Sequence, residues 1–131
     1  MMIGSLLAAM SFSNTKTTAC HSISYPLTLK FKLDHGLACA LSLADILRLN
    51  LSALTNPENV YEAFNINNPE ELWTWIETCA TGIASLKLSD YGVTLTELDE
   101  LADLSFTLGR MDNNPIAITA QQVKNILQFH L

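Results

Sequence analysis

The sequence has few basic residues and no basic run, which excludes several classes of partner. Seven Lys and Arg stand against thirteen Asp and Glu in 131 residues, giving a net charge of −6. Binding to nucleic acid requires clustered Lys and Arg that neutralise phosphates. The same scarcity of basic residues argues against binding to anionic membrane surfaces. We therefore expect neither nucleic acid nor a membrane as a partner.

Cysteine is also scarce, with an odd number of widely spaced residues and no CxxC pair: Cys20, Cys39 and Cys79. This pattern does not form a disulfide framework, and it argues against a thiolate metal site. We expect free thiols in a reducing compartment, the cytoplasm.

The apolar start lacks the charged leader of a signal peptide. No Lys or Arg precedes the run Met1–Met10, and the run is too short to span a bilayer. Residues 1–14 instead predict a helix whose small residues pack tightly on a neighbour. A hydrophobic share of 49% fits either a well-filled core or a surface that packs against a larger protein.

Helix signals recur along the first half of the chain, and no segment shows convincing period-two alternation. Apolar residues at helical spacing predict a helix over 18–30, which Pro26 should bend or interrupt. Asp34 is a candidate N-cap for a single helix over 35–49. An Asn-Pro pair at 56–57 opens a short helix that holds Val60, Tyr61 and Phe64.

Similar signals predict the helices of the second half. Asn68 and Pro69 open a helix reaching about residue 86. Thr94 begins a capping-box pattern before a helix ending near residue 107, and Thr119 caps a last helix over 120–129. No repeat or Gly/Ser-rich linker divides the chain. We predict one all-α domain over residues 1–131, with six or seven helices.

Histidines are the first candidates for chemistry, because neutral imidazole is a common metal ligand. His21 and His35 lie on neighbouring predicted helices joined by a short bend. Their spacing is not the i, i+4 pattern that places two ligands on one helical face. From this spacing alone, the two residues are better explained as ordinary core or capping histidines than as metal ligands. His130 is expected at the surface or as a partner of the last helix dipole.

Two segments of the sequence carry a family resemblance. Residues 12–28 begin Phe-Ser-Asn and lead through His21 to Tyr25 and Pro26, and a second histidine, His35, follows 14 residues after the first, directly before Gly36. This pattern resembles the signature of the iron-containing alcohol dehydrogenases, in the helical C-terminal half of their dehydroquinate synthase-like fold. Residues 13–28 and 109–119 are most similar to the branch that includes phosphonoacetaldehyde reductases.

The resemblance implies a metal-dependent transfer of hydride between a nicotinamide cofactor and an alcohol or aldehyde. In the family one Asp and three His hold Fe²⁺, or sometimes Zn²⁺, and only His21 and His35 of that set are present here. The Asp-x-x-x-His helix and the Gly-rich loop of the NAD(P)-binding N-terminal domain are absent. We expect a fragment or split subunit, inactive alone, which needs a missing nucleotide-binding half or a homo-oligomer.

Three further residues acquire candidate roles from the resemblance. Tyr25 stands where many relatives carry a histidine and is a candidate proton relay, although packing explains a Tyr before Pro equally well. Phe12 matches a ring that lines the substrate pocket, with core packing as the alternative. Lys16 is a candidate contact for an anionic substrate, with a solvated loop lysine as the alternative.

Departures from the family pattern leave other interpretations open. Asp34 replaces a usual Pro, and Leu37 replaces a His of the closest branch, so the substrate is undetermined. A degenerate, non-catalytic helical module for binding or dimerisation is the main alternative. A third is an adaptor anchored by Trp73 and Trp75. These residues are two apart on a helix and face different directions, so at least one is expected in the core.

Overall fold

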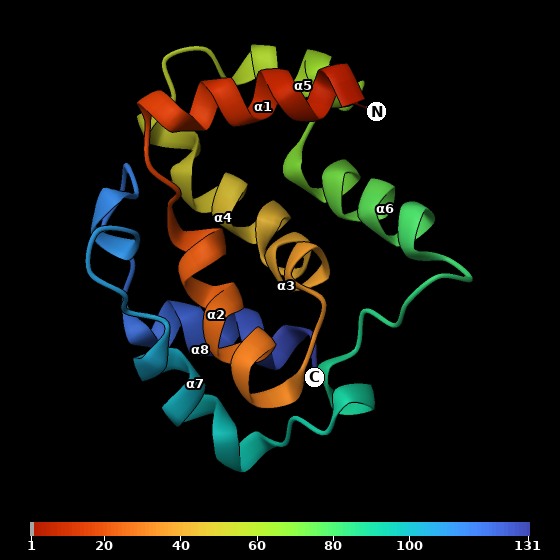
Figure 1. Ribbon diagram of the computed structural model, residues 1–131, viewed down its shortest axis with the longest axis vertical. Helices are drawn as coiled ribbons and strands as arrows, with labels where there is room; N and C mark the ends of the chain where they lie inside the picture. The colour runs from red at the N-terminus through yellow and green to blue at the C-terminus, as the bar shows by residue number, and fades with distance from the viewer. Residues whose placement is uncertain (1) are drawn as a thin grey trace.

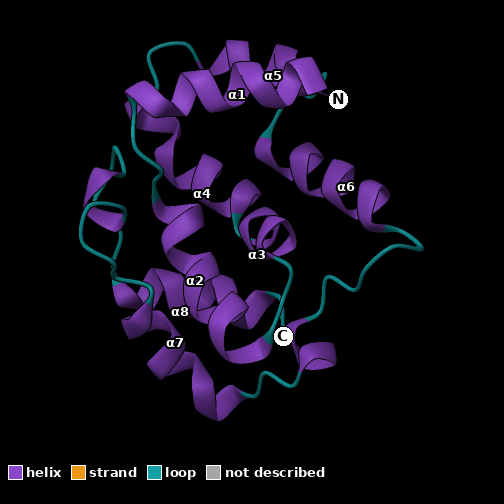
Figure 2. Cartoon of the chain, in the orientation of Figure 1, coloured by secondary structure: helices purple, strands orange, loops and turns teal. Residues whose placement is uncertain are grey.

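The computed structural model describes residues 2–131, and all regular structure in this range is helical (Figures 1 and 2). The predicted all-α class is confirmed. There are eight α-helices, because one predicted helix is divided, and four short 3₁₀ segments, η1 to η4. The α-helices are α1 (Met2–Asn14), α2 (Ala19–Phe31), α3 (His35–Leu41), α4 (Leu43–Asn50), α5 (Pro57–Phe64), α6 (Pro69–Ala80), α7 (Leu98–Leu104) and α8 (Ala120–Phe129). The 3₁₀ segments are η1 (Leu51–Ala53), η2 (Leu88–Tyr91), η3 (Leu95–Glu97) and η4 (Met111–Asn113).

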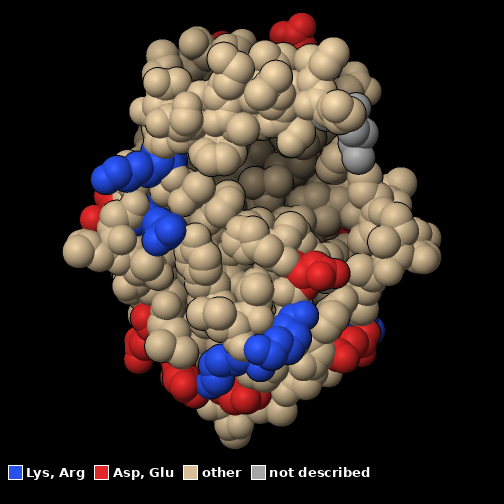
Figure 3. All heavy atoms as spheres, viewed as in Figure 1, with Lys and Arg blue, Asp and Glu red and all other residues tan. Residues whose placement is uncertain are grey.

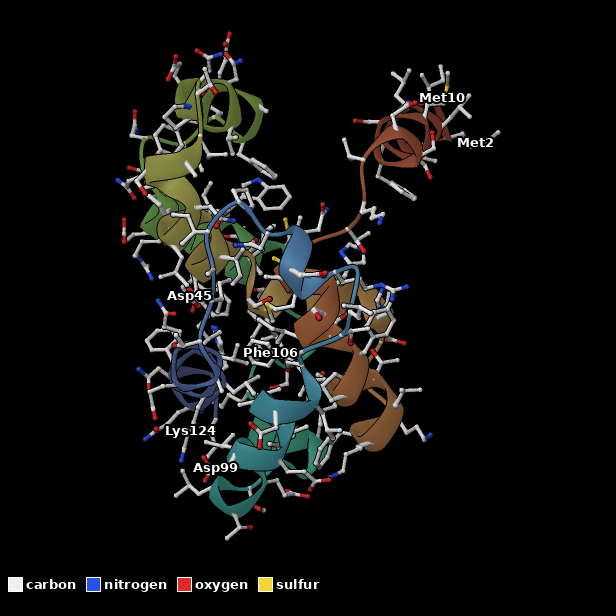
Figure 4. All side chains as sticks on the ribbon, turned by 90° about the vertical axis from the view of Figure 1, so that its left-hand side faces the viewer. Met2, Met10, Asp45, Asp99, Phe106 and Lys124 are labelled. Atoms are coloured by element: carbon white, nitrogen blue, oxygen red, sulfur yellow. The ribbon has the colours of Figure 1, made fainter. Side chains whose placement is uncertain are left out.

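Helix α1 forms where it is expected, but it buries none of its side chains against the rest of residues 2–131. None of its residues is buried, and Ile3 is 76% exposed. The helix overlaps α5 in Figure 1, whereas the turned view of Figure 4 separates it from the body. The predicted neighbour for this helix is therefore not supplied by this part of the chain.

Helix α2 runs through the centre of the domain. Pro26 lies inside it, and the helix continues to Phe31, so the prediction of an interruption at Pro26 is wrong. Proline removes its own N–H donor and crowds the carbonyl four residues earlier, but neither effect ends this helix. The burial of Ile23 and Leu27, both 0% exposed, stabilises the same turns, at roughly 1.5–3 kcal/mol for each side chain.

The predicted single helix over 35–49 is divided into α3 and α4. The break is at the buried Ser42, and the two pieces are bent by 44°. Because of the bend, α3 packs against α2 while α4 packs against α6. Asp34 occupies the N-cap position of α3, but its carboxylate makes no capping hydrogen bond.

Predicted helix starts in the second half are confirmed by their hydrogen bonds. The Asn68 side chain accepts from the backbone N–H of Glu71 at 2.9 Å. Thr119 accepts from the backbone N–H of Gln122 in a complete capping box. The Thr94 pattern also forms, ahead of η3 and α7. These caps satisfy N–H groups that a helix start leaves free.

Helix α6 ends at Ala80 rather than near residue 86. Gly82 follows with φ of +74°, a conformation that glycine adopts without strain. Ile83, which the helical pattern places on an apolar face, is 83% exposed. The apolar residues of the predicted helix extend beyond Ala80 because the segment that follows also packs against the protein. Ala84 and Leu86 are partly buried there, although their backbone is not helical.

The core has two parts, which meet at α4. Residues of α2, α3, α7 and α8 enclose the larger part around Leu101, and α4 and α6 enclose the smaller part around Leu72. A buried pair of amides, Asn50 and Asn114, joins distant segments through side-chain hydrogen bonds of 3.0 and 2.7 Å. Burying both amides together satisfies polar atoms that would otherwise be unpaired.

His130 is buried, at 5% exposure, so the expectation of a surface position is wrong. Its Nε2 lies 3.2 Å from Asp45 Oδ2, and its ring lies 4.6 Å from the ring of Trp73. Trp73 is half-buried, whereas Trp75 is 46% exposed and contacts Phe64 edge-to-face. The two tryptophans face different directions, as their spacing predicts.

No helix in residues 2–131 is by itself long and apolar enough to cross a membrane. The bent pair formed by α3 and by α4 with η1 meets that test jointly, on length and composition only.

Candidate metal centre

Two imidazoles lie next to each other where α2 meets α3. His21 is in the first turn of α2, and His35 is the first residue of α3. Their ring centroids are 5.4 Å apart and the rings meet edge-to-face at 65°. His21 is half-buried and His35 is exposed. The packing of α3 on α2 therefore produces a pair that sequence spacing alone does not place on one helical face.

The buried hydroxyl of Ser24 orients this pair. Its Oγ donates to the backbone carbonyl of His21 at 2.8 Å and lies 3.3 Å from Nδ1 of His35. In the tautomer that carries its proton on Nδ1, His35 donates to this oxygen. Nε2 of His35 then carries the free lone pair, the arrangement that an outer hydrogen bond gives to a metal-ligating histidine.

A third donor atom stands beside the imidazoles. Cys39 Sγ lies 3.8 Å from His35 Nε2, and one ligand atom from each of His21, His35 and Cys39 falls within 4.8 Å of the others. The expectation that the cysteines form no thiolate metal site stays a prediction, and it was made without considering this group. The signal was present in the sequence, because His35 and Cys39 have the i, i+4 spacing of one helical face.

The surroundings of His21 and Cys39 favour the neutral form of both side chains. Burial lowers the pKa of His21, and the nearby His35 and Arg110 lower it further. Burial raises the pKa of the Cys39 thiol, against an opposing contribution from a hydrogen bond with Ser24. A neutral imidazole keeps the lone pair that a cation needs.

The donor set fits a divalent metal ion. Two imidazole nitrogens and a sulfur converge from two helices, and the Ser24 hydroxyl lies within hydrogen-bond distance of one imidazole. Nitrogen and sulfur are the usual ligands of Zn²⁺, and imidazole also suits iron.

Tyr25 and Arg110 form one side of the cluster. The Tyr25 ring is stacked on His35 with centroids 5.8 Å apart, and the Arg110 guanidinium lies 4.7 Å from the centre of the Tyr25 ring. Both residues line a shallow pocket of about 360 Å³. In residues 2–131 the Arg110 side chain makes no ion pair, so its charge is available to another group. Sequence reasoning assigned no role to Arg110.

Phe12 and Lys16 are not brought to this cluster. Phe12 is 55% exposed on α1, and Lys16 is exposed in the link to α2. Figure 3 shows a hollow between α1 and the body, lined by uncharged atoms. On that face Lys and Arg occur in separate spots, and no continuous basic patch forms.

Comparison with known proteins identifies relatives over nearly the whole chain. The model of the Fe-containing alcohol dehydrogenase family, C-terminal, matches residues 1–131. Sulfoacetaldehyde reductase of Bilophila wadsworthia (strain 3_1_6) is 29% identical over 153 aligned residues. Phosphonoacetaldehyde reductase of Streptomyces viridochromogenes (strain DSM 40736 / JCM 4977 / BCRC 1201 / Tue 494) is 54% identical over 35 residues, covering 27% of this chain and 9% of its own.

The fold is also similar to a solved structure. The crystal structure of a 1,3-propanediol oxidoreductase superposes with a TM-score of 0.78 and 26% sequence identity, covering 97% of this chain and 36% of its own. The sulfoacetaldehyde reductase alignment likewise covers 98% of this chain and 36% of the relative. This chain thus spans about a third of the length of these relatives.

Proposed function

The chain belongs to the iron-containing alcohol dehydrogenase family, as its C-terminal part, and from this premise we propose that it is the metal-binding portion of an aldehyde reductase or alcohol dehydrogenase. The observation that carries the proposal is the pair His21 and His35, 5.4 Å apart and joined through Ser24. The nucleotide-binding portion is supplied by a separate chain or segment.

In this proposal the chain's own residues hold and orient the reacting groups. His21 and His35 are two ligands of a divalent ion, and Ser24 fixes the ring of His35. When bound, Fe²⁺ or Zn²⁺ supplies a Lewis acid that polarises a carbonyl, and NAD(P) supplies the hydride. The phenol of Tyr25, stacked on His35, is placed to pass a proton to or from the substrate oxygen.

The missing half is the partner we propose for α1. Exposed apolar side chains run along this helix, and the chain covers only 36% of its full-length relatives. A helix with no buried residue gains little stability from packing, whereas covering its apolar surface would contribute roughly 25 cal/mol per Å². Docking there would also enclose the uncharged hollow between α1 and the body. The exposed apolar set is Met2, Ile3, Leu6, Leu7, Met10 and Phe12.

We propose an aldehyde with a strongly acidic head group as the substrate class. Two relatives are named for sulfoacetaldehyde and phosphonoacetaldehyde, and both compounds are short aldehydes carrying an anion. Arg110 places an unpaired cation beside Tyr25 and His35. A guanidinium presents several N–H donors to such oxyanions. Lys16 becomes a second candidate contact once α1 is covered.

Co-expression with the nucleotide-binding half of a family member tests the proposal. The complex should contain stoichiometric Fe or Zn and should oxidise reduced cofactor when an acidic aldehyde is added. His21→Ala and His35→Ala should lose both metal and activity, while the exposed Cys79→Ser control should keep them. Unchanged metal content in both histidine variants would contradict the ligand assignment.

The same experiment separates the enzyme from a non-catalytic module. The unpartnered α1 is compatible with a helical module that binds a partner or forms dimers. A stable complex or dimer that holds no metal and does not oxidise the cofactor would support that second function.

A further inference from the structure

We propose that Cys39 is a third protein ligand, so that this chain supplies a His₂Cys set to a zinc-like divalent ion. The inference rests on the proposed function, because it takes His21 and His35 as ligands. It adds a sulfur donor contributed by the first turns of α3. Three protein ligands drawn from histidine and cysteine are found at catalytic zinc ions.

The geometry of α3 directs the sulfur toward the imidazoles. Cys39 follows His35 by four residues, so both side chains leave the same face of the helix. Bond lengths near 2.3 Å to sulfur and 2.1 Å to nitrogen place tetrahedral ligand atoms roughly 3.4–3.6 Å apart. The Sγ to Nε2 distance of His35 is already 3.8 Å, and no pair in the cluster exceeds 4.8 Å. A contraction of no more than about 1.4 Å in any pair therefore completes the site.

In its Nδ1–H tautomer, His35 directs its free lone pair toward Cys39. Nδ1 is engaged by the buried Ser24 hydroxyl at 3.3 Å, so Nε2 is the nitrogen available to a metal ion. This is the nitrogen that Cys39 Sγ approaches. One cation can then contact the sulfur and the imidazole without rotating either side chain far.

The other two cysteines are natural controls. Cys20 is 9% exposed and belongs to the hydrophobic core, and Cys79 is exposed on α6. Neither is grouped with the histidines. Any sulfur coordination by a metal that also binds His21 and His35 should therefore come from Cys39.

A thiolate ligand changes which ions the site prefers. Binding forms a metal–sulfur bond, breaks the S–H bond of Cys39 and releases its proton to solvent. Thiolate is a soft donor, so the set with two imidazoles favours Zn²⁺, or Co²⁺ as its spectroscopic substitute, over harder ions that prefer oxygen ligands. The chain should hold such an ion more tightly than two imidazoles alone would.

Cobalt titration of the 131-residue chain tests this inference. Co²⁺ bound to thiolate produces a sulfur-to-metal charge-transfer band in the near ultraviolet, separate from the visible bands of the ion. Wild type and Cys79→Ser should show the band, and Cys39→Ser should lack it. Loss of an outer-shell partner weakens metal binding roughly 10–100-fold, so loss of a direct ligand should weaken it at least as much.

The results distinguish the sulfur ligand from the imidazole pair. Wild type could show the visible cobalt bands without a charge-transfer band, and His21→Ala could lose those visible bands. That result would overturn the Cys39 assignment and leave the proposed function standing. Binding that is unaffected by His21→Ala would overturn both. The absence of any binding to the isolated chain would overturn the Cys39 assignment alone, because two imidazoles without the ligands of the other half hold a metal weakly. A measurement that needs no variant is alkylation mapped by mass spectrometry. Co²⁺ should protect Cys39 but not Cys79, and equal alkylation of Cys39 with and without cobalt would contradict its role.

Discussion

The Ser24 hydroxyl connects the two histidines of the cluster, because Oγ donates to the His21 carbonyl at 2.8 Å and lies 3.3 Å from His35 Nδ1. One buried side chain on α2 thus ties the backbone of one candidate ligand to the ring of the other. The position of Ser24, one helical turn after His21, makes this geometry a property of α2 and of the way α3 packs on it.

Removal of the Ser24 hydroxyl should weaken metal binding even though the candidate ligands His21 and His35 are unchanged. In Ser24→Ala, Nδ1 of His35 loses its partner and the ring loses its fixed orientation. Outer-shell changes of this kind lower metal affinity roughly 10–100-fold. Competition with a zinc indicator measures the change. Ser52→Ala, at an exposed position in η1, is the control, and equal affinities for the two variants would contradict the orienting role.

The three thiols should react with a disulfide reagent in a fixed order. Cys79 is exposed and should react first, while burial raises the pKa of Cys39 and slows it. Burial raises the pKa of Cys20 to about 11, so almost no thiolate is present at pH 8. Time-resolved mass mapping gives the order, and Cys20 should react only as fast as the chain unfolds. Early modification of Cys20 in folded protein would contradict this.

Asp45→Asn should destabilise the fold by about 1–3 kcal/mol at pH 7, because hydrogen bonds to a charged group are lost. Burial alone would raise the pKa of Asp45, but hydrogen bonds from His130 and Arg48 outweigh it and lower the pKa. The stabilisation is therefore complete above the unfolded value of about 3.9 and is lost as pH falls through the lower folded value.

Urea denaturation at a series of pH values measures this effect. The difference between wild type and Asp45→Asn should be constant near neutrality and shrink below about pH 4. Asp112→Asn, at an exposed residue of η4, is the control and should change the free energy of unfolding little. A difference that persisted undiminished to pH 2 would mean that the Asp45 carboxylate charge is not its source.

In the isolated chain, a substitution in α2 should lower the free energy of unfolding much more than a substitution in α1. Leu27→Ala removes a fully buried side chain of α2 and should lower the free energy of unfolding by about 2–5 kcal/mol. Leu6→Ala, at a residue 60% exposed on α1, should change it by less than about 0.5 kcal/mol. Chemical denaturation of the two variants provides the comparison.

The same α1 variant should weaken the assembled enzyme. If the missing half covers α1, Leu6→Ala should raise the dissociation constant of the co-expressed complex, as measured by calorimetry. Thr96→Ala, at an exposed residue of η3, is a control distant in sequence from α1. Equal dissociation constants for wild type and Leu6→Ala would argue against α1 as the docking surface.

Local signals in the sequence decided the class of the fold and most helix starts. Asn68 and Thr119 cap helices as predicted because a cap depends on residues within one turn. The His21 and His35 spacing, through its resemblance to a family signature, also led to the correct family. The predicted metal role of both residues stays a prediction, as do the roles of Tyr25, Phe12 and Lys16.

Packing between distant segments decided what the sequence did not. The break at Ser42, the burial of His130 against Asp45 and the approach of Cys39 to His21 depend on contacts that no local pattern encodes. Helical periodicity determines which residues share a face, and it placed His35 and Cys39 together. Only the seating of α3 on α2 brings His21 to that face, because relative helix position is set by how the whole core fills its volume.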